Sequence, residues 1–205
     1  MFANRFVNKN NNDFLNIAII ANPSMGLDAL CASIGLKELI KLSLKDKKQD
    51  ISIDIYYLAT LPFGAEILRD KAKVKNKLGE KSLEIEFPAE SLEKVLYDYN
   101  QEKKSFKISL VGFKGKKPLK KEISFKEVKE EFDLMIGLGF KDIKEFERYH
   151  TEIKSTSKKE VFNKENLKSK SLTEGIMDLF YSEKIKPSKT ASVAFFTYLS
   201  SPSVK

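Results

Sequence analysis

The sequence has almost none of the side chains that build thiol or imidazole centres, since its 205 residues include one cysteine and one histidine. A single cysteine, Cys31, excludes a disulfide within the chain and cannot form a zinc site by itself. The lone histidine, His150, excludes a histidine-rich metal centre. Functions that depend on clusters of thiols or imidazoles are therefore excluded.

Long hydrophobic runs are missing as well. No apolar run reaches the roughly 18–20 residues that cross a bilayer, and residues 1–14 form a polar, Asn-rich extension unlike a signal peptide. Hydrophobic residues make up 41% and charged residues 32% of the chain, which is typical of a globular domain and too apolar for a disordered one. We expect a cytoplasmic protein without a membrane partner.

Positive charge is concentrated in two segments of a chain whose formal net charge is +8. Residues 101–130 hold ten Lys against four Glu, and residues 154–170 hold six Lys against two Glu. Such segments either solvate the surface or bind phosphate groups and nucleic acid. The sequence leaves both interpretations open.

The order of apolar segments predicts the fold. Residues 15–21 are a continuous apolar run typical of a buried parallel strand, and an apolar stripe from Leu27 to Leu42 predicts a helix directly after it. Residues 51–58 alternate between apolar and polar side chains and are rich in β-branched residues, which predicts a second strand. Residues 132–138 are a second buried run that ends in a glycine turn. Three more helices are expected, one ending near Phe146 and two at 172–182 and 188–199. This alternation predicts an α/β fold, an open and mainly parallel sheet with helices on both faces.

The middle of the chain has a different pattern. Residues 82–87 predict a short strand, and residues 92–100 and 106–113 flank a polar loop, which favours an antiparallel β-hairpin. A helix is the competing interpretation for the first arm. We therefore expect one domain over residues 15–205, with an inserted hairpin region at about 90–125.

Three segments carry a resemblance to a known family. Residues 17–36 read IAIIANPSMGLDALCASIGL, residues 133–148 read DLMIGLGFKDIKEFER, and the third runs over residues 153–180. In these segments the chain resembles a DHH-superfamily phosphoesterase domain, the superfamily that includes RecJ-like exonucleases and nanoRNA phosphatases. The resemblance implies a parallel α/β fold with its active site at one edge of the sheet.

The first family motif has lost most of its metal ligands. The pattern HxxxDxDALGSALAL places its histidine on Asn22, its first aspartate on Gly26 and its second on Asp28. The aspartate that ends a later strand in active relatives is Gly139 here. A two-metal phosphoesterase needs four or five carboxylates and imidazoles, so Asp28 alone cannot hold such a centre.

The central family motif has also lost its metal-binding residues. DHHxxNxxFGxxN falls on residues 154–166, where Phe162 and Asn166 match and the metal-binding triplet has become Lys154, Ser155 and Thr156. The following Ser-Leu-Thr-Glu at 171–174 resembles the SSTAE of the family. A lysine in place of a metal-facing carboxylate repels a divalent cation and attracts a phosphate.

The resemblance and the strand ends together define a candidate ligand-binding site. Its residues are Asn22, Ser24, Gly26, Asp28, Gly139, Lys154, Ser155, Thr156, Lys158 and Lys159. Backbone N–H groups where the first helix begins favour an anion, although Asn22 or Ser24 could equally cap a structural turn. No catalytic residue, cofactor or metal is expected. Asp28 is the one weak metal candidate, and its alternative role is a first-turn carboxylate stabilised by the helix dipole.

Two further sets of side chains have competing interpretations. Cys31 and His150 could form a nucleophile and base, but Cys31 lies on the apolar stripe of the first helix, where a buried core cysteine is more usual. Tyr97 and Tyr99, like the Tyr56-Tyr57 pair, fall in expected strands, where packing is more usual than stacking on bases.

Three functions remain open. The first is a catalytically degenerate DHH-like domain that binds a phosphate-bearing ligand, a short nucleic acid or a protein partner at the former active-site edge. The second is a divergent metal-dependent phosphoesterase with replacement ligands among Asp28, Asp54, Asp133 and Asp142. The third is a scaffold or homodimer that binds no ligand, which a large exposed apolar patch would favour.

Overall fold

The structure, a computed structural model, describes residues 14–45, 50–62, 64–78, 81–86, 92–112, 122–129, 131–149 and 158–202. The chain divides into two compact units. The first unit comprises residues 1–80 and 130–205, and the second comprises residues 81–129. The hairpin region expected at about 90–125 thus lies inside a unit that begins and ends further out along the chain.

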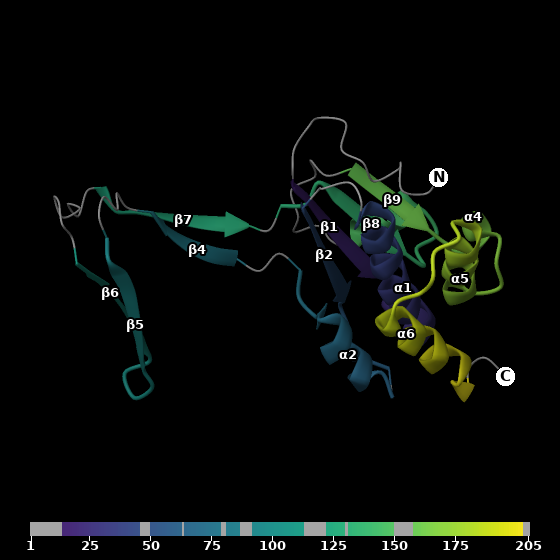
Figure 1. The fold of residues 1–205 in the computed structure, drawn as a ribbon, viewed down its shortest axis with the longest axis horizontal. Helices are drawn as coiled ribbons and strands as arrows, with labels where there is room; N and C mark the ends of the chain where they lie inside the picture. The colour runs from purple at the N-terminus through teal and green to yellow at the C-terminus, as the bar shows by residue number, and fades with distance from the viewer. Residues whose placement is uncertain are drawn as a thin grey trace. The chain divides into compact units, whose positions relative to one another are not determined.

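The first unit contains an all-parallel sheet of five strands in the order β3-β2-β1-β8-β9 (Figure 1). Its strands are β1 (Phe14–Ala21), β2 (Asp50–Tyr57), β3 (Val74–Lys75), β8 (Leu134–Leu138) and β9 (Lys158–Phe162). The expected α/β class and open parallel sheet are confirmed. β1 lies in the middle, where its residues Ile17 to Ala21 are 0% exposed, as expected of an apolar run in a parallel sheet.

Helices cover both faces of this sheet. They are the 3₁₀ turn η2 (Pro23–Met25), α1 (Gly26–Leu44), α2 (Glu66–Ala72), α3 (Ile143–Arg148), α4 (Lys164–Leu167), α5 (Leu172–Ser182) and α6 (Lys189–Leu199). The helices α1, α5 and α6 lie on one side of the sheet and pack against each other (Figure 1). No helix in the described ranges combines the length and the hydrophobicity that spanning a membrane requires.

Two hydrophobic cores follow from the alternation of side chains along β1. Ile17 and Ile19 point to the larger core with α1, α5 and α6, whereas Ala18 and Ile20 point to a smaller core on the other face. In the smaller core Phe146 of α3 packs beside the rings of Tyr56, Phe132 and Phe140. Both faces of the central strand are therefore buried from Ile17 to Ala21, which explains why these five residues are all apolar.

The second unit consists of two antiparallel pairs of strands. β4 (Lys81–Glu86) pairs with β7 (Ser124–Lys129), and β5 (Lys94–Asn100) pairs with β6 (Ser105–Val111). The expected hairpin is confirmed, and the competing helix for its first arm is wrong. Alternating apolar residues at 95, 97 and 99 fit a strand with one apolar face, whereas a helix would scatter them. Residues 87 and 113, expected to end strands, lie outside the described ranges.

Candidate functional site

Four parallel strands of the first unit end level with each other. Ala21 of β1 pairs with Tyr57 of β2 and with Leu138 of β8, and Leu138 pairs with Phe162 of β9. The residues that follow these strand ends lie at one edge of the sheet, called here the carboxyl edge. Ligands of open α/β sheets bind at this edge, so it is the natural place to look for a site.

Asn22, where the family motif has a histidine, is a structural residue here. Its side-chain Nδ2 donates to the carbonyl of Gly139 at 3.0 Å, and its Oδ1 accepts from the backbone N and the hydroxyl of Ser24 at 3.0 and 2.9 Å. Its backbone N–H donates to the carbonyl of Leu138 at 2.8 Å. The side chain is 3% exposed, so it ties together two strand-end turns and is not available to a ligand.

The two glycines of the candidate site support the same turns. Gly26 has φ +54 and ψ −129, a conformation that side chains other than glycine rarely adopt, although a Cβ there would meet open space. Gly139 has φ +82, and a Cβ would lie 2.8 Å from Cγ of Met25 and 3.0 Å from Cδ1 of Leu172. Gly139 therefore allows the turn after β8 to pack directly on the start of α1 and α5.

Asp28 caps another helix. Its two carboxylate oxygens accept the backbone N–H groups of Leu172 and Thr173 at 3.0 and 2.8 Å, and the hydroxyl of Thr173 donates to the backbone carbonyl of Asp28 at 3.0 Å. Ser171 accepts the next N–H, that of Glu174, at 3.1 Å. Three of the N–H groups that a helix start leaves unpaired are thus satisfied within the protein. The segments of the chain that resemble two family motifs do meet, but as a helix cap.

The other acidic side chains considered as replacement metal ligands are dispersed. Asp54 pairs with Lys75 at 3.0 Å, Asp133 accepts the backbone N–H of Asn16 at 2.8 Å, and Asp142 caps α3 by accepting from the N–H of Glu145 at 2.8 Å. Within the described residues no group of three or more His, Cys, Asp or Glu could hold a metal ion. The structure does not bring these carboxylates together.

Two of the candidate lysines, Lys158 and Lys159, lie at the other end of the sheet. Lys158 and Lys159 begin β9 and pair with Leu134 and Met135 at the start of β8, four and three residues before the strand ends. Lys158 forms an ion pair with Glu160 and Lys159 one with Glu147, both at 2.7 Å. The structure therefore separates these lysines from Asn22, because β9 starts rather than ends at them. Lys154, Ser155 and Thr156 lie outside the described ranges.

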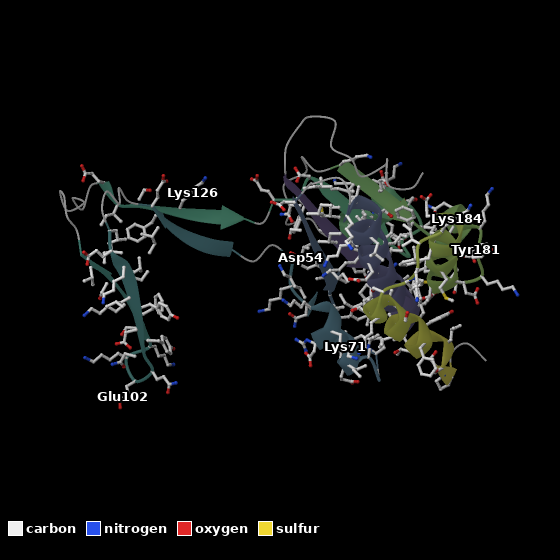
Figure 2. The ribbon with its side chains drawn as sticks, in the orientation of Figure 1. Asp54, Lys71, Glu102, Lys126, Tyr181 and Lys184 are labelled. Atoms are coloured by element: carbon white, nitrogen blue, oxygen red, sulfur yellow. The ribbon has the colours of Figure 1, made fainter. Side chains whose placement is uncertain are left out.

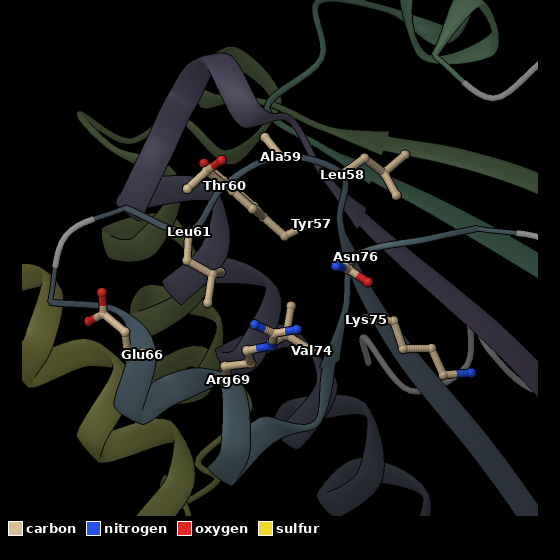
Figure 3. Close-up of a pocket in the computed structure, with 10 residues that line it drawn as sticks. All are labelled: Tyr57, Leu58, Ala59, Thr60, Leu61, Glu66, Arg69, Val74, Lys75 and Asn76. Atoms are coloured by element: carbon tan, nitrogen blue, oxygen red, sulfur yellow. The ribbon is translucent and has the colours of Figure 1, made fainter. Parts of the chain in front are cut away.

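A cavity of about 420 Å³ opens beside the ends of β2 and β3 at the carboxyl edge (Figure 3). It is lined by the loop after β2, by the outer side of α2 and by β3: Tyr57, Leu58, Ala59, Thr60, Leu61, Glu66, Arg69, Val74, Lys75 and Asn76. Its volume lies in the range of small-molecule sites, about 300–1,000 Å³. None of the ten residues was in the candidate site expected from sequence.

Arg69 places a guanidinium in the wall of this cavity. Among the described residues its guanidinium has neither an ion pair nor a hydrogen bond, and Figure 3 shows it extending toward Val74 and away from the carboxylate of Glu66. Lys75, by contrast, is held by Asp54 at 3.0 Å and lies 5.5 Å from the centre of the Tyr56 ring. Arg69 is therefore the cation of the lining that has no ion-pair partner among the described residues.

Neutral hydrogen-bonding groups surround this cation. Tyr57, at the end of β2, donates its hydroxyl to the carbonyl of Pro23 at 3.4 Å, which links the cavity wall to the turn that precedes α1. Burial, and to a smaller extent Tyr149, raises the pKa of Tyr57 above its ordinary value, so the hydroxyl stays protonated. Thr60 and Asn76 are exposed at the rim and add a hydroxyl and an amide.

Cys31 has the core role that its place on the helix predicts. It is 0% exposed within the larger core, and burial, followed by the nearby carboxylate of Asp28, raises its pKa to about 12. A thiol in this state is a poor nucleophile. His150, the base considered for a dyad, lies outside the described ranges.

Sequence reasoning missed Arg69 because α2 has seven residues and β3 has two, too few for an apolar period to be visible. The available signal was the break Leu61-Pro62 directly after a strand, which marks a loop at the carboxyl edge. Comparisons of the chain with protein-family models, with curated proteins and with solved structures gave no match.

Proposed function

We propose that this chain is a non-hydrolytic binding protein that takes a phosphate-bearing small molecule, or the phosphate end of a short nucleic acid, into the cavity beside β2 and β3. The observation that carries the proposal is Arg69, a guanidinium that has no ion-pair partner among the described residues and lines a cavity at the carboxyl edge of a parallel sheet. A guanidinium offers parallel N–H donors that match the oxygens of a phosphate.

The surrounding groups support an anion rather than a cation as ligand. Lys75 is neutralised by Asp54, and Glu66, the one acidic side chain of the wall, directs its carboxylate away from the guanidinium of Arg69 (Figure 3), which leaves that guanidinium free to meet an anion. Thr60 and Asn76 supply neutral donors and acceptors of the kind that orient a ligand. The apolar side chains Leu58 and Leu61 give the cavity a surface on which an uncharged part of the ligand can pack.

Binding without hydrolysis is supported by the roles of the acidic residues. Metal-assisted phosphoryl chemistry uses several carboxylates around the same ions. Here Asp28 caps α5, Asp54 neutralises Lys75, and Asp142 caps α3. The resemblance to DHH phosphoesterases points the same way, since Asn22 and Gly26 stand where that family has metal ligands.

The direct test is calorimetry with inorganic phosphate and with adenosine 5′-monophosphate on the full chain. Arg69→Gln should weaken binding of both by about 10- to 100-fold, the usual worth of a charge-assisted hydrogen bond to a phosphate. Lys71→Gln is the matched control, because Lys71 is exposed on the same helix and does not line the cavity (Figure 2). The control should bind within about twofold of the unmodified protein.

A second control separates the cavity from the general basicity of the surface. Lys158→Gln with Lys159→Gln removes two positive charges at the far end of the sheet and should leave binding within about twofold. Affinity should fall moderately as salt is raised, because salt screens the attraction between the guanidinium and the phosphate. Equal losses from Arg69→Gln and from the double lysine variant would contradict the proposal.

A further inference from the structure

The β5–β6 hairpin of the second unit has one face that is entirely apolar. Its register places Val95 opposite Leu110, Tyr97 opposite Ile108, and Tyr99 opposite Phe106. Residues opposite each other and two apart along a strand share a face, so these six side chains form a single surface, called here the aromatic face. The other face pairs Asp98 with Lys107 and Asn100 with Ser105 and is mostly polar.

The aromatic face is exposed. Tyr97 is 78%, Phe106 61% and Tyr99 57% exposed, although the rings of Tyr97 and Phe106 stack with their centres 6.2 Å apart. Figure 2 shows side chains projecting from both faces of this hairpin, with Glu102 at its turn. A two-stranded ribbon is at best marginally stable in water unless its apolar face is covered. We therefore expect another surface to pack on the aromatic face.

We propose that a second copy of this chain covers it, so that two hairpins pack aromatic face to aromatic face across a twofold axis. A wholly apolar face is complementary to itself, which is the requirement for a symmetric interface. With aromatic side chains contributing about 150–250 Å² each, the exposed part of the face is on the order of 500 Å² per copy. Two copies then bury on the order of 1,000 Å², the lower limit for a specific interface.

The charges of the hairpin favour a second copy over a nucleic acid. Residues 92–112 hold four Lys against two Glu and one Asp, so the ribbon carries little net charge. Lys94 and Lys107 belong to the polar face, by the register, while Lys103 and Lys104 lie in the turn. Within residues 92–112, bases stacked on the aromatic face would therefore find no row of cations for their phosphates, which single-strand binding surfaces provide.

Sedimentation velocity over a range of concentrations tests the inference on the full chain. The unmodified protein should show a reversible equilibrium between the 23.4 kDa chain and a species of twice that mass. Tyr97→Thr with Phe106→Thr keeps β-propensity and should raise the dimer dissociation constant by about 100-fold or more. The matched control, Asp98→Thr with Lys107→Thr on the polar face, should change it by less than about threefold.

Cross-linking provides a readout that does not depend on removing aromatic rings from both strands. Tyr97→Cys and Leu96→Cys place a thiol on the aromatic and the polar face of the same strand, and the buried Cys31 adds no background. A short bis-maleimide should join two copies of the Tyr97→Cys protein and leave the Leu96→Cys protein single. The inference is overturned by a chain that stays monomeric at all concentrations, by equal cross-linking of both variants, or by a dimer that Tyr97→Thr with Phe106→Thr leaves intact.

The inference does not depend on the cavity beside β2 and β3. A thymidine oligonucleotide that binds the monomeric chain, and whose binding is lost in Tyr97→Thr with Phe106→Thr, would assign the face to nucleic acid and also overturn the proposed dimer. The cavity proposal is unaffected by either result, because Arg69→Gln tests it through a residue of the first unit.

Discussion

The two units of the chain use similar apolar residues in opposite ways. In the first unit β1 lies between two strands and between layers of helices, and Ile17, Ile19 and Ile20 are 0% exposed. Among the described residues of the second unit, no third strand pairs with the ribbon β5–β6, and Tyr97 and Phe106 are more than half exposed. The first unit contains its own core, whereas the second exposes an apolar surface.

This difference separates stability from association. Burial of apolar surface stabilises a fold by about 25 cal/mol per Å², so side chains already buried carry the stability and exposed ones contribute little until a partner arrives. We expect substitutions in the first unit to change the free energy of unfolding and those on the aromatic face to change oligomeric state. Substitutions in the two units should therefore differ in how much they change the free energy of unfolding.

The largest effect is expected from Ile19→Ala. This side chain is 0% exposed in the centre of the larger core, so its removal leaves a cavity and should lower the free energy of unfolding by about 2–5 kcal/mol. Tyr97→Ala removes a larger side chain from the aromatic face and should change that free energy by less than about 0.5 kcal/mol in the monomeric protein. Urea denaturation at low protein concentration measures both free energies. Similar losses in the two variants would contradict the difference between the two units.

An intermediate effect is expected from Asp28→Ala. The substitution removes both carboxylate contacts to the start of α5 and should lower the free energy of unfolding by about 2 kcal/mol, the upper range for a helix cap. Asp98→Ala is the matched change on the hairpin and should cost less than about 0.5 kcal/mol. Calorimetry with Mn²⁺ should show no tight site in the unmodified protein. A stoichiometric site that is present there and lost in Asp28→Ala would restore the metal interpretation.

The smallest effect is a gain in stability from Lys37→Met. Lys37 is 8% exposed on α1 and donates to the carbonyl of Ala72 at 3.3 Å. Burial, then repulsion by Lys41, lowers its pKa, an effect that Asp54 and Glu38 partly offset and Lys73 reinforces. A buried lysine with a lowered pKa destabilises the fold below its unfolded pKa, so Lys37→Met should stabilise the protein by about 1 kcal/mol at pH 7.

The pH dependence of that gain checks its cause. The penalty on Lys37 is fully present below its folded pKa and disappears as pH rises through the unfolded value of 10.5. The advantage of Lys37→Met should therefore shrink between neutral pH and pH 10.5 in urea denaturation. Lys144→Met, which replaces an exposed lysine of α3 that does not act on the pKa of Lys37, should give no such trend. A gain that is independent of pH would point to packing instead.

The strands of the first unit's sheet were predictable where their sequence is an apolar run or a regular alternation of apolar and polar residues. β1, β2 and β8 follow from their runs of apolar and β-branched residues, and the expected bounds of α5 match because Ser171 caps it. β9 was missed because an edge strand with the sequence KKEVF has only two apolar residues. Strand pairing with β8, rather than local sequence, determines its conformation.

The candidate site was predictable only in part for a related reason. Asn22 and Gly139 meet because both follow buried strands whose carboxyl ends are level, and the ends of buried strands are visible in sequence. Lys158 and Lys159 were grouped with them by the family motif alone, and the undetected strand β9 places them at the opposite end. The cavity depends on how α2 and β3 fold back on β2, which no local pattern encodes.

The most direct test of the central claim is a map of ligand contacts on the full chain by ¹⁵N–¹H NMR during titration with adenosine 5′-monophosphate. We expect the side-chain Nε–H signal of Arg69 and the backbone signals of Thr60 and Asn76 to shift together with one affinity. Signals of Lys158, Lys159 and the β5–β6 hairpin should stay in place. Shifts confined to lysines outside the cavity, with Arg69 unchanged at saturation, would contradict it.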